Sequence, residues 1–406
     1  MNHPFSLVPH DRIRSVDGHA TGLLQDYTCR SAYQPIVSPA LMRMVGMEAL
    51  LRVERGGTPL DTARFFAGLD EEQVVESCRL ARAIHVLNVP ETALGNEWLF
   101  LNVHPESIRK RRASAGSLVS ELAALGMGPE RIVLEIVESA PLTDTELADF
   151  VSEYRREGFR IAIDDFGAGA SNYDRVLSVH PDIIKLDRSL IANASASSRA
   201  RRLFPHMVAL LREAGSLVLV EGIENEEQAH IAIDADAELL QGYFFAKPAA
   251  GLPDQALQRS RLAALMTPAN AAVMRQRPAE EKLRSRFLDA WTRFRDGTPL
   301  ELIAQEINEP QVTRLYVIDS KGYQIGDTAM TRHALRGMSH PLSNAKGACW
   351  ARRHYFRRAN EQPGRIQMTR PYLSLTEQRL CVTYSCATSH KEYGPCVVCM
   401  DVLIDS

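Results

Sequence analysis

The sequence predicts an α/β protein whose first domain is a TIM-like (β/α)8 barrel with one antiparallel strand, followed by a smaller α+β domain. Three observations favour this fold class. Between residues 27 and 250, eight short apolar runs alternate with segments of helical period. Several of these runs are apolar at consecutive positions, which is typical of strands buried on both faces of a parallel sheet. After residue 280 the pattern changes to short strands separated by turns.

The first two apolar runs are too close together for a helical crossover. Only Pro39–Met44 separates Tyr33–Ser38 from Val45–Val53, so this pair is expected to form a hairpin in which one strand runs antiparallel. The later links are long enough for helices, which favours a closed barrel. An open, doubly wound sheet is the alternative. The remaining runs are Trp98–Val103, Ile132–Val137, Arg160–Phe166, Ile183–Asp187, Leu217–Ile223 and Glu238–Phe245.

Changes of composition divide the 406 residues into four parts. Residues 1–26 are polar and are expected to form a loose leader before the barrel of residues 27–250. Residues 251–279 mix Pro, Ala and Arg and are expected to form a connector. Residues 280–406 begin with a helical period and continue as strands, which predicts a separate small domain.

The bulk composition is that of an ordinary globular chain. Apolar residues make up 45%, charged residues 24%, and the net charge is −3, so neither a nucleic-acid polymer nor a membrane is expected as a partner. No apolar run reaches the length of about 18 residues that a membrane span needs, and no signal peptide is predicted. Seven cysteines, an odd number, favour reduced thiols in the cytoplasm.

Nearly every predicted strand of the barrel carries an acid or an amide within or at the end of its apolar run. In such barrels the active site lies at the C-terminal ends of the strands. A single carboxylate at this position is most often a helix N-cap or part of a surface ion pair. A whole set needs another explanation. The set comprises Glu48, Asn102, Glu135, Asp164, Asp165, Glu221 and Gln241, together with Lys185.

Five carboxylates at one barrel mouth would repel one another and raise each other's pKa values. Lys185 alone cannot neutralise them, and an ionised carboxylate buried without a partner is costly. Divalent cations can neutralise the set, and oxygen ligands favour hard ions such as Mg²⁺ or Mn²⁺ over Zn²⁺. The adjacent Asp164 and Asp165 suggest a carboxylate that bridges two ions, a recurrent device for phosphodiester hydrolysis.

The same residues match, in order, the motifs of the EAL family of cyclic di-GMP phosphodiesterases. The motif that names the family stands as Glu48-Ala-Leu50 within Glu48–Arg52. Residues 27–250 resemble the family throughout, and many spaced motifs in order are far more specific than one short match. The other matching segments are Tyr33–Ile36, Asn102, Leu134–Glu138, Asp164–Gly167, Lys185–Asp187, Glu221–Glu224 and Gln241–Phe244.

The resemblance implies two metal ions, Mg²⁺ or Mn²⁺, and a catalytic role for Lys185, Asp165 and Glu221. Lys185 would contact the attacking water and the developing charge. Glu221 is the candidate general base, although metals alone can lower the pKa of bound water, and the sequence leaves both routes open. The first ion would be held by Glu48, Asn102, Glu135 and Asp164, and the second would be served by Asp164, Asp165 and Glu221.

The resemblance also implies contacts to the substrate, cyclic di-GMP. Arg52 would pair with a phosphate through its planar fork, Gln34 and Leu50 would contact the substrate, and Gln241 would orient the site. The implied reaction is in-line attack of water on one phosphodiester, which gives linear pGpG.

The loop after Asp165 departs from the family pattern at one position. Ala168 stands where the family more often has Thr, and Glu138 is expected to anchor this loop. Many family members bind cyclic di-GMP without cleaving it. The alternative function is therefore a catalytically weak receptor that signals through its C-terminal domain.

Residues 280–406 resemble the PAS/Cache-like domain that follows the EAL domain in some cytoplasmic family members. This implies a sensor for an unknown ligand, with a dimerisation or capping module without ligand as the other interpretation. The resemblance also implies a homodimer. A metal or redox site could be drawn from Cys396, Cys399 and their neighbours, although buried apolar cysteines are the commoner arrangement.

Overall fold

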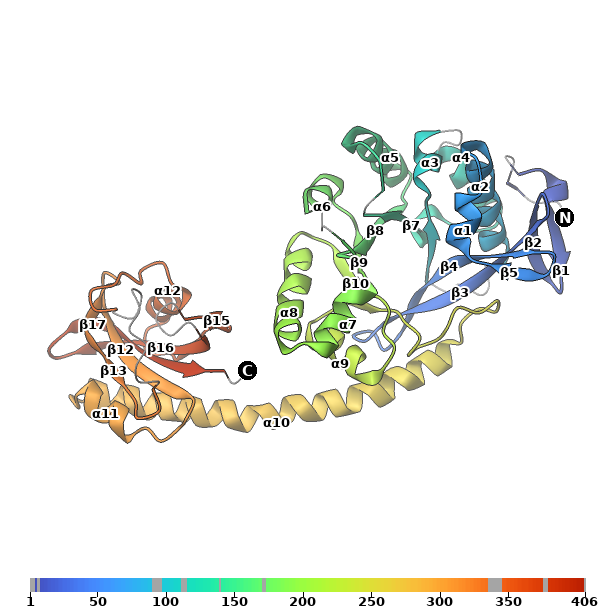
Figure 1. Cartoon of the computed structure of the whole chain (residues 1–406). Helices are drawn as coiled ribbons and strands as arrows, with labels where there is room; N and C mark the ends of the chain where they lie inside the picture. Colours follow the sequence, from blue (N-terminus) through green and yellow to red (C-terminus); the bar gives the residue numbers. More distant parts are fainter. Residues whose placement is uncertain are drawn as a thin grey trace. The chain divides into compact units, whose positions relative to one another are not determined.

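The computed structural model describes residues 4–5, 8–89, 97–110, 115–138, 140–169, 173–334, 345–374 and 379–404, with the backbone alone described for residues 267–279. The chain divides into two compact units, Met1–Ala269 and Asn270–Ser406 (Figure 1). None of the helices in the described part of the chain has the length and apolar character that a membrane span requires.

The first unit contains a closed barrel of eight strands, which confirms the predicted barrel and excludes the open sheet. Seven strands run parallel, and β3 (Tyr27–Ser38) runs antiparallel to both of its neighbours, β4 (Arg43–Arg55) and β11 (Leu239–Leu240). β3 and β4 form the predicted hairpin. The other barrel strands are β6 (Trp98–Asn102), β7 (Ile132–Val137), β8 (Arg160–Phe166), β9 (Ile183–Leu186) and β10 (Leu217–Val220).

The two long strands of this hairpin extend beyond the barrel. Here β3 pairs with β2 (His19–Leu24), which in turn pairs with β1 (Ile13–Val16), while β4 pairs with β5 (Thr58–Leu60). The β1–β2 hairpin differs from the loose leader expected for residues 1–26. Ile13 and Leu24 are buried in the main core, so a few apolar residues are enough to attach this edge hairpin.

Helices connect the parallel strands and cover the outside of the barrel (Figure 1). Two of them begin with a capping box: Asp70 and Gln73 start α2 (Glu71–Leu87), and Thr143 and Glu146 start α5 (Asp144–Arg156). The others are α1 (Thr62–Ala67), α3 (Pro105–Arg109), α4 (Ala115–Ala123), α6 (Tyr173–Val179), α7 (Arg188–Ala196), α8 (Ser198–Glu213) and α9 (Glu226–Asp234).

A layer of apolar side chains fills the barrel interior. Each of seven strands contributes one residue: Ile36, Phe100, Val133, Ala162, Ile183, Leu219 and Leu239. β4 contributes Gly46, where an added Cβ would lie 2.9 Å from the Phe100 ring. The Phe100 ring therefore occupies space that any larger residue at position 46 would need.

This apolar layer places the predicted site residues directly above it. Side chains two residues apart along a strand point to the same side of the sheet. Glu48 therefore follows Gly46 inside the barrel. In the opposite strand β3 the equivalent residue is Gln34, two positions before Ile36. The remaining residues at the second position are Asn102, Glu135, Asp164, Lys185, Glu221 and Gln241.

The second unit is built on an antiparallel sheet in the order β13–β12–β17–β16–β14, with β15 also paired to β16. This agrees with the expected α+β class. The segment expected to be a connector, residues 251–279, instead lies largely within one long helix, α10 (Gln255–Arg295). The other elements are α11 (Leu300–Glu306), β12 (Val312–Asp319), β13 (Gln324–Met330), α12 (His354–Glu361), β14 (Gln367–Met368), β15 (Tyr372–Leu373), β16 (Leu380–His390) and β17 (Gly394–Leu403).

The cysteines of β17 do not form a shared site. Cys396 packs in one apolar cluster with Phe287, whereas Cys399 packs in another with Tyr316. The two clusters lie on opposite faces of the sheet, because residues three apart in a strand point in opposite directions. Both thiols are free and buried, so Cys396 and Cys399 do not form a site with each other, and each packs as an apolar side chain.

Replacing Phe100 by Ala tests the apolar layer beneath the site. The substitution leaves a cavity in the closed barrel, and we expect a loss of about 3–5 kcal/mol in the free energy of unfolding. Leu203→Ala is the control, since Leu203 is 58% exposed on α8 and should change stability by less than about 0.5 kcal/mol. Denaturant unfolding followed by circular dichroism measures both. Equal stability of the two variants would contradict the layer's role.

Candidate active site

Lys185 lies at the centre of the barrel mouth, with its side chain 1% exposed. Its Nζ atom is 2.6 Å from Glu221 Oε1, 2.7 Å from Glu135 Oε1 and 2.9 Å from Asp164 Oδ1. Glu48 Oε2 is 3.6 Å away. Four of the five predicted carboxylates therefore surround a single ammonium group.

A chain of amides holds Glu48 in place. Asn102 Nδ2 donates to Glu48 Oε1 at 3.1 Å, and Gln241 Nε2 donates to Glu48 Oε2 at 2.7 Å. Gln241 Nε2 also lies 3.2 Å from Gln34 Oε1, and Gln34 Nε2 donates to the Ala246 carbonyl at 3.0 Å. Both carboxylate oxygens of Glu48 thus have a fixed donor, which sets its orientation.

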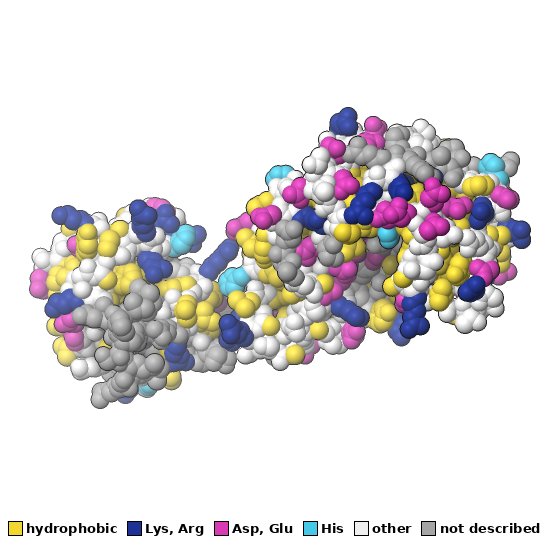
Figure 2. All heavy atoms as spheres, turned by 45° about the horizontal axis from the view of Figure 1, so that its top comes forward, with side chains coloured by type: hydrophobic (Ala, Val, Ile, Leu, Met, Phe, Trp, Pro, Cys, Tyr) yellow, Lys and Arg dark blue, Asp and Glu magenta, His cyan; other side chains and the backbone are white. Residues whose placement is uncertain are grey.

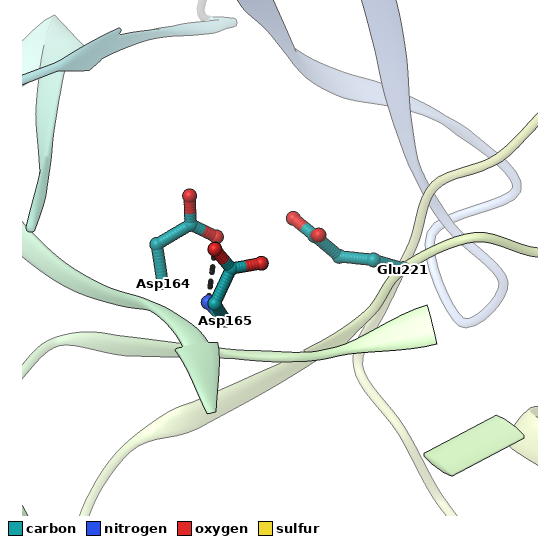
Figure 3. A group of neighbouring side chains, drawn as sticks. All are labelled: Asp164, Asp165 and Glu221. Atoms are coloured by element: carbon teal, nitrogen blue, oxygen red, sulfur yellow. Dashed lines mark hydrogen bonds between the residues drawn. The ribbon is translucent and has the colours of Figure 1, made fainter. Parts of the chain in front are cut away.

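The fifth acid, Asp165, joins Asp164 and Glu221 in a second group. Carboxylate oxygens of these three residues lie within 4.8 Å of one another, and their side chains point toward a common space in Figure 3. Asp165 has a left-handed backbone with φ of 57°, and its amide donates to Asp164 Oδ1 at 3.0 Å. This uncommon conformation turns Asp165 toward the group at the end of β8.

The loop after Asp165 is held by Glu138, as the sequence analysis expected. Glu138 is buried, and its Oε2 atom accepts a hydrogen bond of 3.1 Å from the Gly167 amide. Gly167 has a φ of 91°, and a Cβ there would lie 2.6 Å from the side chain of Leu190. Glycine is therefore required at this turn.

Burial raises the pKa of three of the acids. It raises the pKa of Glu221 to about 8 and that of Glu135 well above its usual value, although the Lys185 ammonium opposes both shifts. The pKa of Asp165 is raised by burial and by the neighbouring Asp164. These shifts share one cause, since removal from water disfavours the charged form of each acid.

The pKa values of Glu48 and Lys185 are shifted in the direction that favours the charged form of each residue. Burial alone would raise the pKa of Glu48, but the Lys185 ammonium and the bonded amides outweigh it and lower the pKa. Burial alone would lower the pKa of Lys185, but the surrounding carboxylates, Asp164 first, raise it well above the usual value. The surrounding carboxylates therefore favour the charged form of Lys185.

The donor set fits hard divalent cations. Among the described residues, the buried oxygens Glu135 Oε2 and Gln241 Oε1 accept no hydrogen bond, and buried acceptors without donors are costly. One ammonium group also supplies a single positive charge against five carboxylates. Additional cations with oxygen ligands would satisfy both deficits, as Mg²⁺ or Mn²⁺ does elsewhere.

A cavity of about 350 Å³ adjoins the acidic group on the side of Glu48 and Asn102. Of the residues expected to contact substrate, Leu50 and Arg52 line it. Gln34 and Gln241 do not line this cavity, because they are buried in the amide chain that holds Glu48.

Residues that the sequence analysis did not single out also line this cavity, among them Phe66, Arg82 and His104. The Phe66 and His104 rings stack with centroids 5.4 Å apart. Phe66 and Arg82 lie on the helices α1 and α2, where no motif marks them. His104 had a weak signal, since it follows Asn102 by two residues at the end of a predicted strand.

Known proteins with sequences similar to this chain include several that are named cyclic di-GMP phosphodiesterases. RocR of Pseudomonas aeruginosa, a cyclic di-GMP phosphodiesterase, is 34% identical over 161 residues, which cover 39% of each chain. TpdA of Vibrio parahaemolyticus, also a cyclic di-GMP phosphodiesterase, is 27% identical over 241 residues, covering 58% of this chain and 39% of TpdA. The chain thus spans about two fifths of the length of these curated relatives.

Solved structures with a similar fold are also known. One is the EAL-domain protein YkuI of Bacillus subtilis, in complex with the substrate c-di-GMP and calcium. It matches with a TM-score of 0.74 and 21% identity, over 93% of this chain and 97% of YkuI. At this identity the match shows likeness of fold alone. BlrP1 of Klebsiella pneumoniae, in a complex with calcium and cyclic di-GMP, has a TM-score of 0.52 and 27% identity, covering 62% and 64% of the two chains.

The family itself is shown by a match over more than half of the chain. Residues 21–248 match the model of the EAL domain, and this range contains all eight barrel strands and every residue around Lys185. The chain therefore belongs to the EAL family.

Proposed function

We propose that this protein hydrolyses one phosphodiester bond of cyclic di-GMP to give linear pGpG, using two divalent ions, Mg²⁺ or Mn²⁺. The observation that carries this proposal is the ring of buried carboxylates around Lys185, which is too acidic for one ammonium to neutralise. Relatives named cyclic di-GMP phosphodiesterases support it. Complexes of BlrP1 with cyclic di-GMP and calcium or manganese support the metal requirement.

The acids of the barrel mouth would divide between two ions. One ion would be held by Glu48, Asn102, Glu135 and Asp164. Asp164, Asp165 and Glu221, which already lie together, would serve the other. When bound, the ions would lower the pKa of water and neutralise charge on the phosphate.

Two side chains of the protein, Lys185 and Glu221, would act directly on the attacking water and on the charge that develops on the phosphate. Glu221 would accept the proton of the attacking water, a role in which a general base is most effective when its pKa lies near the working pH. Lys185 would donate to the water and to the phosphoryl oxygen on which charge develops. The leaving 3′ oxygen would take a proton from solvent.

The cavity beside Glu48 would bind one half of the dinucleotide. Arg52 at its edge would pair with a phosphate through its fork. The stacked rings of Phe66 and His104 offer an aromatic face for a guanine base. Leu50 would pack against the same half of the substrate.

The second unit, proposed as a PAS/Cache-like sensor for an unknown ligand, would regulate hydrolysis in a cytoplasmic homodimer. Its antiparallel sheet with helices supports this role only at the level of fold class. The alternative is a catalytically weak receptor that binds cyclic di-GMP and signals through this unit. Ala168, which supplies no hydroxyl to the loop of Asp165, is the feature that favours the alternative.

Hydrolysis is tested by incubating the full chain with cyclic di-GMP and Mg²⁺ or Mn²⁺ and resolving products by chromatography. We expect pGpG, and turnover at least about 100-fold lower in Glu221→Gln, because the variant lacks the base. The control Glu226→Gln changes an exposed acid on α9 and should keep full activity. Folded protein that binds cyclic di-GMP with either metal but releases no pGpG would favour the receptor.

Replacing Lys185 by Met tests its role as counter-ion of the metal-free site. The variant leaves four carboxylates without a cation, and we expect the metal-free protein to lose about 3–5 kcal/mol of stability. Saturating Mn²⁺ should restore more stability to the variant than it adds to the wild type, since the ion then replaces the lost charge. Thermal unfolding with chelator and with Mn²⁺ measures this, and Lys321→Met, at an exposed turn, is the control. A variant as stable as the wild type without metal would rule this role out.

The raised pKa of Glu221 predicts how the stability of the metal-free protein depends on pH. Between its usual value of 4.5 and about 8, folded Glu221 keeps a proton that the unfolded chain has released. The unfolded state then binds fewer protons, so stability should fall as pH rises through this range, by at most about 1.4 kcal/mol per pH unit for this group. Denaturant midpoints in chelator measure the slope, which Glu221→Gln should reduce. An unchanged slope in the variant would show that Glu221 does not titrate in this range.

A further inference from the structure

A buried arginine on α6, Arg175, lies behind the loop that contains Glu138. Arg175 is only 8% exposed to solvent. Its Nη1 atom donates to the carbonyl of Glu138 and, at 3.1 Å, to that of Ala140, while Nη2 lies 3.4 Å from the Leu142 carbonyl. The guanidinium fork thus gathers three carbonyl oxygens, and none of the residues that supply them lies in a helix or a strand.

This segment is connected to the acidic group through Glu138. The Glu138 amide donates to the Asp164 carbonyl at 2.8 Å, and the Glu138 carboxylate accepts from the Gly167 amide at 3.1 Å. Arg175 therefore fixes the backbone of Glu138, which reaches Asp164 through its main chain and Gly167 through its side chain.

Asp165 depends on this support because its backbone is in an unfavourable region. A left-handed conformation is uncommon, although aspartate adopts it more readily than most residues, and such residues persist where their surroundings impose the conformation. Asp165 has a φ of 57°, and within the loop its carbonyl accepts from the Ala168 amide at 3.1 Å. The same loop is also held by the hydrogen bond from the Gly167 amide to Glu138.

We propose that Arg175 is a positioning residue for the active site: it holds Glu138, which holds Gly167, and so keeps the Asp165 carboxylate directed at Asp164 and Glu221. The consequence for ion binding rests on the proposed function, whereas the effect on the loop does not. Groups hydrogen-bonded directly to metal ligands typically change metal affinity by about 10–100-fold. Arg175 acts through Glu138, so its effect is expected at the lower end of that range.

Arg175→Met and Arg175→Lys test the proposal in the full chain, with Arg155→Met as the matched control. Arg155 on α5 also donates to backbone carbonyls, to His180 at 2.7 Å and to Val179 at 3.4 Å, but these precede β9 at the opposite end of the barrel. Two measurements are made: Mn²⁺ affinity by titration calorimetry, and hydrogen exchange of the peptide around Gly167 in metal-free protein.

We expect Arg175→Met to bind Mn²⁺ about 10-fold more weakly, the lower end of the effect of ligand-bonded partners, and to exchange faster at Gly167. Arg175→Lys should fall between it and the wild type, because it keeps the charge but loses the planar fork. Arg155→Met should match the wild type in both measurements. If Arg175→Met does not fold, Arg175→Lys decides by the same criteria.

Unchanged exchange at Gly167 in the Arg175 variants would overturn the proposal, and so would unchanged Mn²⁺ affinity alongside a wild type that binds the ion. A wild type that binds no Mn²⁺ would instead remove the proposed metal-dependent function. The exchange measurement would then still decide whether Arg175 holds the loop.

Discussion

Repulsion among carboxylates within one barrel mouth is the constraint on which the rest of this site depends. Glu135, Asp164 and Glu221 lie within 3 Å of the same Lys185 nitrogen, so none of them can move without disturbing the balance of charge around the others. The amides of Asn102 and Gln241 complete the arrangement by donating to Glu48. The opposite pKa shifts of Glu48 and Glu221 follow from this uneven supply of donors.

The barrel supplies this arrangement through the two-residue repeat of its strands. An apolar layer that includes Phe100 and Val133 excludes water from below. The polar side chains above it lie two residues further along the same strands, so the strands also set their positions. The same strands therefore both bury the polar side chains and set their positions. This burial is also the reason that the acids acquire unusual pKa values, since the layer that aligns them also separates them from solvent.

Much of this could be predicted from the sequence because strands buried on both faces leave a continuous apolar signal, in which a polar residue is conspicuous. Glu135 within Val133–Val137 and Lys185 within Ile183–Leu186 are examples. The short link of Pro39–Met44 was likewise sufficient to predict the β3–β4 hairpin, which the register confirms.

Other features have no such signal. The β1–β2 hairpin is short, so its few apolar residues did not stand out from a polar segment. Arg175 binds backbone carbonyls, and carbonyls are the same at every position of a chain. The buried roles of Gln34 and Gln241 depend on two strands that lie 207 residues apart in sequence and meet only on closure of the barrel.

The reversed direction of β3 has a consequence for how the barrel opens. The barrel closes between β3 and β11 through few backbone pairs. β11 consists only of Leu239–Leu240, and Leu240 pairs with Val37. One further bridge, between Tyr33 and Ala249, fastens the outer part. Breathing motions should begin where the fewest ladder bonds must break. Gln34 and Gln241 face each other across this closure, so the amide contact that fixes Glu48 spans the least securely fastened junction of the ring.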